Sequence, residues 1–180
     1  MKSYIKHHIN VIITASRILI AIASIFAVIN IGMGILMIIK NDHDLARDFL
    51  SQTFKLPDFI INEEVWIAVI FGLLYGTLLF YLVYGVKQFY KCLNKIKAGK
   101  MFYNEQSDSL RKAGAIIIIF AKVKYLLFST IGLIAFFDIP ILFKQILPFL
   151  GVYLAGKILL LMAHMAEKGV FIKEENELTI

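Results

Sequence analysis

A compact group of side chains that could bind a metal ion is Asp42, His43 and Asp44, with Asp48 about one helical turn further on. Carboxylates and imidazoles are common ligands of divalent metal ions. No further His or Cys lies close to this group in the sequence. We therefore expect a solvated acidic loop at this position and no metal site.

Patterns that would support catalysis are missing from the sequence. It contains no glycine-rich phosphate loop, no Gly-x-Ser-x-Gly turn and no pair of carboxylates within an apolar segment. Its single cysteine, Cys92, cannot form an internal disulfide, and we expect it to be a structural thiol. The sequence thus predicts a protein that is not an enzyme and that has no cofactor.

Lys157 is a charged residue in the middle of an apolar block. A charge at the centre of a bilayer costs about 2.5–3.5 kcal/mol on insertion scales. Two interpretations stay open for this lysine. It makes an intramembrane polar contact, with Asn30 as the candidate neighbour, or it lies on a tilted helix and extends its ammonium group to the interface.

The apolar residues are gathered into long blocks that could position such groups. They make up 59% of the 180 residues, and charged residues make up 18%, whereas soluble domains average about 45–50% and about 25%. A helix of about 20 apolar residues crosses the ~30 Å hydrocarbon layer and satisfies its own backbone groups there. We expect four such spans, at about residues 18–39, 65–86, 114–137 and 146–166.

The third and fourth spans need a connection between them. Pro140 and Pro148 bracket a polar step at Lys144 and Gln145, and proline disfavours an uninterrupted helix. We expect a tight reversal at this step. The predicted fold class is therefore all-α, an integral membrane four-helix bundle formed as a single membrane domain over residues 1–180.

The distribution of positive charge predicts the orientation. The connection over residues 87–112 carries seven Lys and Arg residues, whereas the one over residues 40–64 carries three against six acids. Positively charged loops stay on the cytoplasmic side, so we expect both termini in the cytoplasm and the protein in the cytoplasmic (inner) membrane. The net charge of +6 lies mostly beside the membrane ends, which indicates contact with membrane lipid rather than direct nucleic-acid binding.

Both main connections have helical features. In the cytoplasmic loop, apolar residues recur at helical spacing up to Ile96, Gly99 is placed to end that helix, and Asn104 can begin the next one. The loop is therefore expected to be a helical hairpin between spans 2 and 3. The outer connection has enough apolar residues, among them Leu45 and Phe49, for a short helix lying on the membrane surface.

The carboxyl end, residues 167–180, is predicted to be a cytoplasmic tail. Glu174, Glu175 and Glu177 place three acids within four residues, just before an apolar ending from Leu178 to Ile180. Such a tail is either solvated or docked in a groove or on a basic surface.

Two segments of the chain resemble a known family. They are the tail that ends Glu174-Glu175-Asn176-Glu177-Leu178-Thr179-Ile180 and the loop Lys95-Ile96-Lys97-Ala98-Gly99-Lys100-Met101-Phe102, with Asn104 and Leu110-Arg111-Lys112-Ala113-Gly114 after it. The pattern is similar to that of the domain of unknown function 2975 family, the YoaS-like bacterial membrane proteins. Genes of that family tend to lie beside one for a small helix-turn-helix regulator. The resemblance therefore implies a membrane partner of a transcription factor, without an established activity.

We interpret the sequence as a non-enzymatic membrane protein that acts by protein contacts at its cytoplasmic face, with a helix-turn-helix regulator or a second copy as partner. The residues expected to bind the partner come from the hairpin turn and from the tail: Gly99, Lys100, Phe102, Glu174, Glu175, Glu177, Leu178 and Ile180. Two alternatives stay open. One is a small transporter or channel subunit in which Lys157 and Asn30 line a polar path, and the other is a structural subunit of a larger membrane complex.

Overall fold

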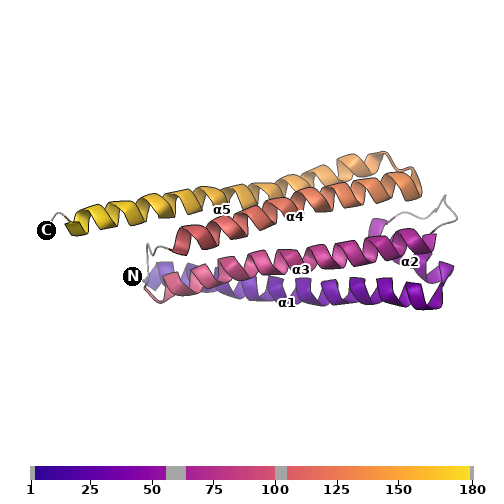
Figure 1. The fold of residues 1–180 in the computed structure, drawn as a ribbon, viewed down its shortest axis with the longest axis horizontal. Helices are drawn as coiled ribbons and strands as arrows, with labels where there is room; N and C mark the ends of the chain where they lie inside the picture. Colours follow the sequence, from indigo (N-terminus) through magenta and orange to yellow (C-terminus); the bar gives the residue numbers. More distant parts are fainter. Residues whose placement is uncertain (1–2, 56–63, 100–104, 179–180) are drawn as a thin grey trace. The chain divides into compact units, whose positions relative to one another are not determined.

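The computed structural model describes residues 3–55, 64–99 and 105–178, and within these ranges all regular structure is helical (Figure 1). Four helices are long and one is short: α1 (Ser3–Lys40), α2 (His43–Phe54), α3 (Glu64–Lys97), α4 (Glu105–Phe136) and α5 (Pro140–Leu178). The four long helices are long and apolar enough to cross a membrane. This confirms the expectation of four apolar helices, each of which extends beyond the span predicted for it.

The ends of the helices follow their local chemistry. Asp42 caps α2, because its Oδ1 accepts a hydrogen bond from the backbone N–H of Leu45 at 3.0 Å. Asp42 therefore has a structural role at the helix start. Gly99 has a φ of +86°, and its N–H donates to the carbonyl of Ile96 at 3.0 Å. The prediction that the second long helix stops at Gly99 is confirmed, since glycine adopts this left-handed conformation without a steric penalty.

The reversal between α4 and α5 differs from the prediction. It occupies residues 137–139, where Phe137 has a φ of +47°, and α5 begins at Pro140. The predicted turn at Lys144 and Gln145 is wrong, because both residues lie inside α5. Proline suits the first position of a helix, where its missing N–H would have no partner, so Pro140 starts α5 instead of ending α4. Pro148 is accommodated within the helix.

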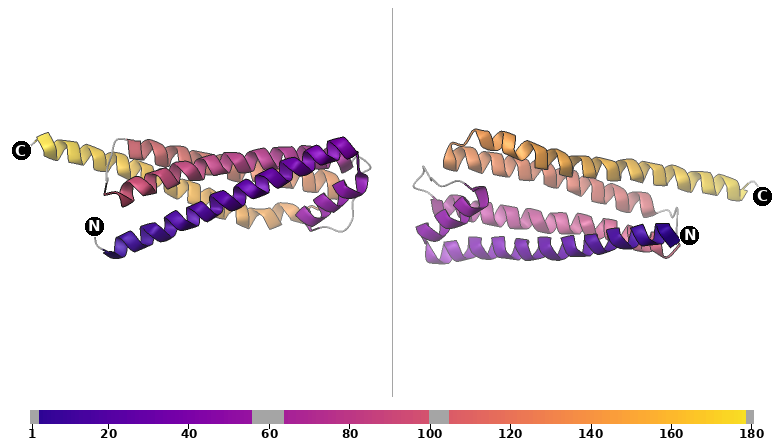
Figure 2. Two further views of the ribbon diagram at one scale, coloured as in Figure 1. Left: turned by 90° about the horizontal axis from the view of Figure 1, so that it is seen from below. Right: turned by 180° about the vertical axis from the view of Figure 1, so that it is seen from behind.

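The chain divides into two compact units, and the helices are seen from two further sides in Figure 2. Unit 1 comprises Met1–Ala23, Tyr81–Ile119 and Val152–Ile180, and unit 2 comprises Ser24–Phe80 and Phe120–Gly151. Each long helix passes from one unit into the other. The single membrane domain proposed from the sequence therefore stays a prediction.

The core of unit 2 is rich in aromatic rings. Phe71 is fully buried, and its ring centroid lies 5.3 Å from those of Phe54 and Phe128 and 5.5 Å from that of Tyr75. Phe54 also packs on Phe136, with the ring centroids 5.5 Å apart. Aromatic pairs at these separations add to the stability gained from burial alone.

The short helix α2 belongs to this core. Its existence as a short helix is confirmed, and its expected position on the membrane surface stays a prediction. Ala46, Leu50 and Phe54 face the core of unit 2 and are buried there. Their four-residue spacing forms one apolar stripe, and the aromatic side chains of α3 and α4 cover that stripe in place of lipid.

Candidate functional site

Unit 1 has a core of its own, built from α3, α4 and α5. The buried residues are Cys92, Leu110, Ala113, Leu159, Ala163 and Ala166, and Phe89, Ile96 and Ile117 pack against them. The end of α3 and the start of α4 thus form the two arms of the predicted hairpin. Helix α5 contributes Leu159, Ala163 and Ala166 to this core.

The two glycines Gly114 and Gly156 fix how α4 and α5 are aligned along their axes. A Cβ atom placed on Gly114 would lie 2.8 Å from the carbonyl oxygen of Gly156, and one on Gly156 would lie 3.0 Å from the carbonyl oxygen of Gly114. Such a close backbone approach is possible only where both residues lack a side chain. Lys157 therefore lies level with the start of the apolar stretch of α4.

Polar contacts connect the helices at this end of unit 1. Arg111 Nη2 donates to Glu167 Oε2 at 2.9 Å, which links α4 to α5. Arg17 Nε donates to the hydroxyl of Tyr90 at 2.9 Å, and its guanidinium carbon lies 5.3 Å from the centre of that ring. These groups are exposed, so they orient the helices more than they stabilise them.

A further ion pair joins the two arms of the hairpin. Lys95 Nζ lies 2.7 Å from Glu105 Oε2, across the turn between α3 and α4. The hydrogen bond and the positive charge of Lys95 hold the pKa of the Glu105 carboxyl below its usual value. The contact requires an ionised Glu105, and acidic pH therefore weakens this link between the arms.

The predicted partner-binding residues fall in two places. Gly99 forms the left-handed end of α3, whereas Lys100, Phe102 and Ile180 lie outside the described residues. Glu174, Glu175, Glu177 and Leu178 form the last turns of α5, which continues as a helix through the predicted tail. Figures 1 and 2 show these turns of α5, in yellow, running on past the first turn of α4.

Several apolar residues on the same part of α5 were not among the predicted site residues. Met165 is 63% exposed, Phe171 61% and Ile172 56%. A signal for Phe171 and Ile172 was present in the sequence, because the apolar run from Val170 to Ile172 follows Ala166 among charged residues. This signal was missed because a membrane span was predicted to end at Ala166 and the residues after it were assigned to a tail.

The two predicted intramembrane polar residues belong to different units. Lys157 is in unit 1 and exposed, with Nζ 5.6 Å from the ring centre of Tyr153 on its own helix. Asn30 is in unit 2 and buried, and its Nδ2 donates to the carbonyl of Phe26 at 2.7 Å. Each therefore has a contact one helical turn away in its own helix.

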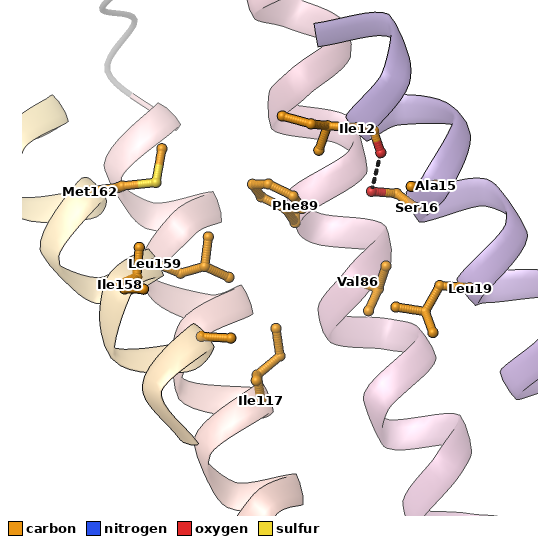
Figure 3. Close-up of a pocket in the computed structure, with 11 residues that line it drawn as sticks. Ile12, Ala15, Ser16, Leu19, Val86, Phe89, Ile117, Ile158, Leu159 and Met162 are labelled. Carbon is orange, nitrogen blue, oxygen red and sulfur yellow. Dashed lines mark hydrogen bonds between the residues drawn. The ribbon is translucent and has the colours of Figure 1, made fainter. Parts of the chain in front are cut away.

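Two hollows lie within unit 1. The first, which we call the inter-helix cavity, has a volume of about 440 Å³, and Figure 3 shows its walls: Ile12, Ala15, Ser16, Leu19, Val86, Phe89, Ile117, Ala155, Ile158, Leu159 and Met162. The second, the α4–α5 groove, measures about 470 Å³, and it is lined by Gln106, Leu110, Met162, Met165, Ala166, Lys168, Gly169 and Ile172. Met162 is common to both.

Comparison with known families covers most of the chain. Residues 53–180 match the family described as protein of unknown function (DUF2975). The chain belongs to this family. No curated protein and no solved structure matches it at a significant level. The family resemblance inferred from the loop and the tail is thus confirmed.

The family match covers particular parts of the site. It includes all of α3, α4 and α5, and hence every residue of the unit 1 core and both arms of the hairpin. Helix α1 lies before the matched region, so four residues of the inter-helix cavity wall, Ile12, Ala15, Ser16 and Leu19, come from outside it.

Proposed function

We propose that this protein is a non-enzymatic, multi-pass membrane protein that acts by protein contacts at its cytoplasmic face. Its docking element is the end of α5, and its partner is a small helix-turn-helix transcription regulator. The observation that carries this proposal is the exposed apolar surface on the last turns of α5, which continue past α4 into a region rich in charge.

The orientation rests on where the basic residues lie. Arg17, Lys87 and Lys112 each stand at the end of an apolar stretch, and all three belong to unit 1. The positive-inside rule then assigns unit 1 to the cytoplasmic side. The described beginning of α1 and the end of α5 both belong to unit 1, as expected for an even number of crossings.

The depth of α5 follows from its alignment with α4. Gly156 packs on Gly114, where the apolar stretch of α4 begins, so Lys157 lies near the cytoplasmic boundary. Residues 140–157 of α5 measure about 27 Å at ~1.5 Å per residue, which is enough for one crossing. Lys157 can then extend to the interface, and the apolar side chains of residues 158–172 emerge on the cytoplasmic side.

The end of α5 presents a face suited to a protein groove. Phe171 and Glu175 are both exposed and four residues apart, so they lie along one side of the helix. A large apolar side chain beside a carboxylate fits an apolar groove with a basic rim. DNA-binding regulators are basic, which supplies the matching charge.

The docking proposal is tested by capture of the helix-turn-helix regulator encoded beside the gene. Phe171→Ala, and deletion of Leu178 to Ile180, are each expected to reduce its capture from membranes about tenfold or more, as loss of an aromatic anchor does. Insertion and abundance should be unchanged, because the four spans are left intact. Ile139→Ala, which removes an equally exposed apolar side chain in unit 2, is the matched control.

The result of that experiment separates the alternatives. A photo-crosslinker at position 171 should form an adduct with the regulator. An adduct with a second copy of this chain would replace the regulator by self-association, and capture that survives both changes would contradict the docking role of α5.

The orientation is tested separately by thiol labelling in intact cells. Cysteines placed at Gln52 in α2 and at Asp108 in α4, both exposed, should react from opposite sides, and only the first with an impermeant reagent added outside. The native Cys92 is buried and should stay silent. Labelling of both positions from the same side would rule out the proposed topology.

A further inference from the structure

The walls of the inter-helix cavity offer almost no polar groups that could form hydrogen bonds with water. Ten of its eleven lining residues are apolar, and the remaining one, Ser16, donates its hydroxyl to the carbonyl of Ile12 at 2.8 Å (Figure 3). The cavity is open to its surroundings, since Ile12, Ile158 and Met162 in its wall are 43%, 58% and 43% exposed. An open apolar surface of this kind favours an apolar guest over water. Its volume of about 440 Å³ is in the range of small-molecule sites.

The cavity shares Met162 with a second, more polar site. This residue also lines the α4–α5 groove, whose lining includes Lys168 and Gln106. Gln106 is 8% exposed, so its amide is held in place within the fold. The neighbouring acid Glu167 is already engaged by Arg111 at 2.9 Å. The lining thus changes from almost wholly apolar in the cavity to one that includes a lysine in the groove.

We propose that unit 1 binds a long-chain fatty acid, with its alkyl chain in the inter-helix cavity and its carboxylate beside Lys168. The gradient from apolar to basic matches a molecule that has an apolar chain and one anionic head. A volume of about 440 Å³ has room for about one long alkyl chain, which argues against a two-chain phospholipid. A neutral or cationic head would leave Lys168 without a matching charge.

This site is separate from the docking element proposed above. Phe171 and the acidic turns after it do not line the cavity or the groove. Ligand binding and regulator capture are therefore independent measurements, and either proposal can fail without the other.

The test uses the full chain in phosphatidylcholine nanodiscs and a palmitic acid that carries a photoreactive diazirine on its chain. We expect adducts on the cavity wall, at Phe89, Ile158 or Met162. Ala15→Phe and Ala155→Phe each fill the cavity from a different helix, and each should abolish these adducts. Ala21→Phe adds the same ring to an exposed position of α1 outside the cavity and should leave them unchanged.

The proposed contact between the fatty-acid carboxylate and Lys168 is tested by competition with unlabelled molecules of equal chain length. Palmitate should compete better than hexadecanol, and Lys168→Gln should weaken palmitate about fivefold while leaving hexadecanol unchanged. Lys112→Gln removes an exposed lysine that lines neither hollow and should have no effect. Adducts that persist in both Ala15→Phe and Ala155→Phe, or equal competition by palmitate and hexadecanol, would overturn the proposal, as would displacement of the probe by phosphatidylcholine.

Discussion

Phe71→Ala is expected to lower the free energy of unfolding by about 3 kcal/mol, the largest effect of any single change considered for this protein. Phe71 is fully buried, and its ring packs on Phe54, Tyr75 and Phe128 in the core of unit 2. Its removal leaves a cavity and forfeits these ring contacts. The value lies at the low end of the range for soluble proteins, because lipid also surrounds apolar groups when helices separate.

Phe80→Ala is the matched control for this prediction. Phe80 lies on the same helix and in the same unit, but it is 43% exposed. Thermal unfolding of the purified variants in one detergent should show a clear drop for Phe71→Ala and a change within about 0.5 kcal/mol for Phe80→Ala. Equal losses would show that the aromatic cluster is not a packed core.

Gly114→Ala is expected to destabilise unit 1 by about 1–3 kcal/mol, because the added methyl group meets the carbonyl oxygen of Gly156 and the helices must move apart. The opposing backbone cannot turn away as a flexible side chain would. The substitution should also reduce fatty-acid labelling, since the proposed site depends on how α4 and α5 align.

Gly151→Ala makes the same chemical change in α5, where nothing lies within 4 Å of the added atom. There the gain in helix propensity, about 0.5–1 kcal/mol, should dominate and stabilise the protein slightly. The two variants should therefore shift the unfolding temperature in opposite directions. A stabilising effect of Gly114→Ala would contradict the close approach of the two helices.

The sequence was sufficient for features that depend on local pattern. Long apolar blocks gave the four helices, and Gly99 marked the end of α3 because only a residue without a Cβ easily adopts its backbone conformation. The apolar spacing from Leu45 to Phe54 gave the existence of α2. The spacing of apolar residues could not show what would cover the apolar stripe of α2. In the structure, the aromatic core of unit 2 covers it.

Other features depend on how helices align, and no local pattern encodes that. Whether Pro140 ends one helix or begins the next is decided by where the backbone turns, at residues 137–139. The depth inferred for Lys157 depends on the contact between Gly114 and Gly156, residues far apart in the chain. The partner-binding residues predicted from the tail stay predictions, although α5 continues as a helix through Leu178.

The core of unit 1 draws all its buried members from α3, α4 and α5. This has a consequence for divergence among relatives, because α1 can change sequence without disturbing that core. A relative could therefore keep the hairpin and the end of α5 while replacing the α1 side of the cavity wall, and so retain a partner while changing its ligand. Selection acting on α1 alone would then change the proposed ligand site and leave the proposed docking element intact.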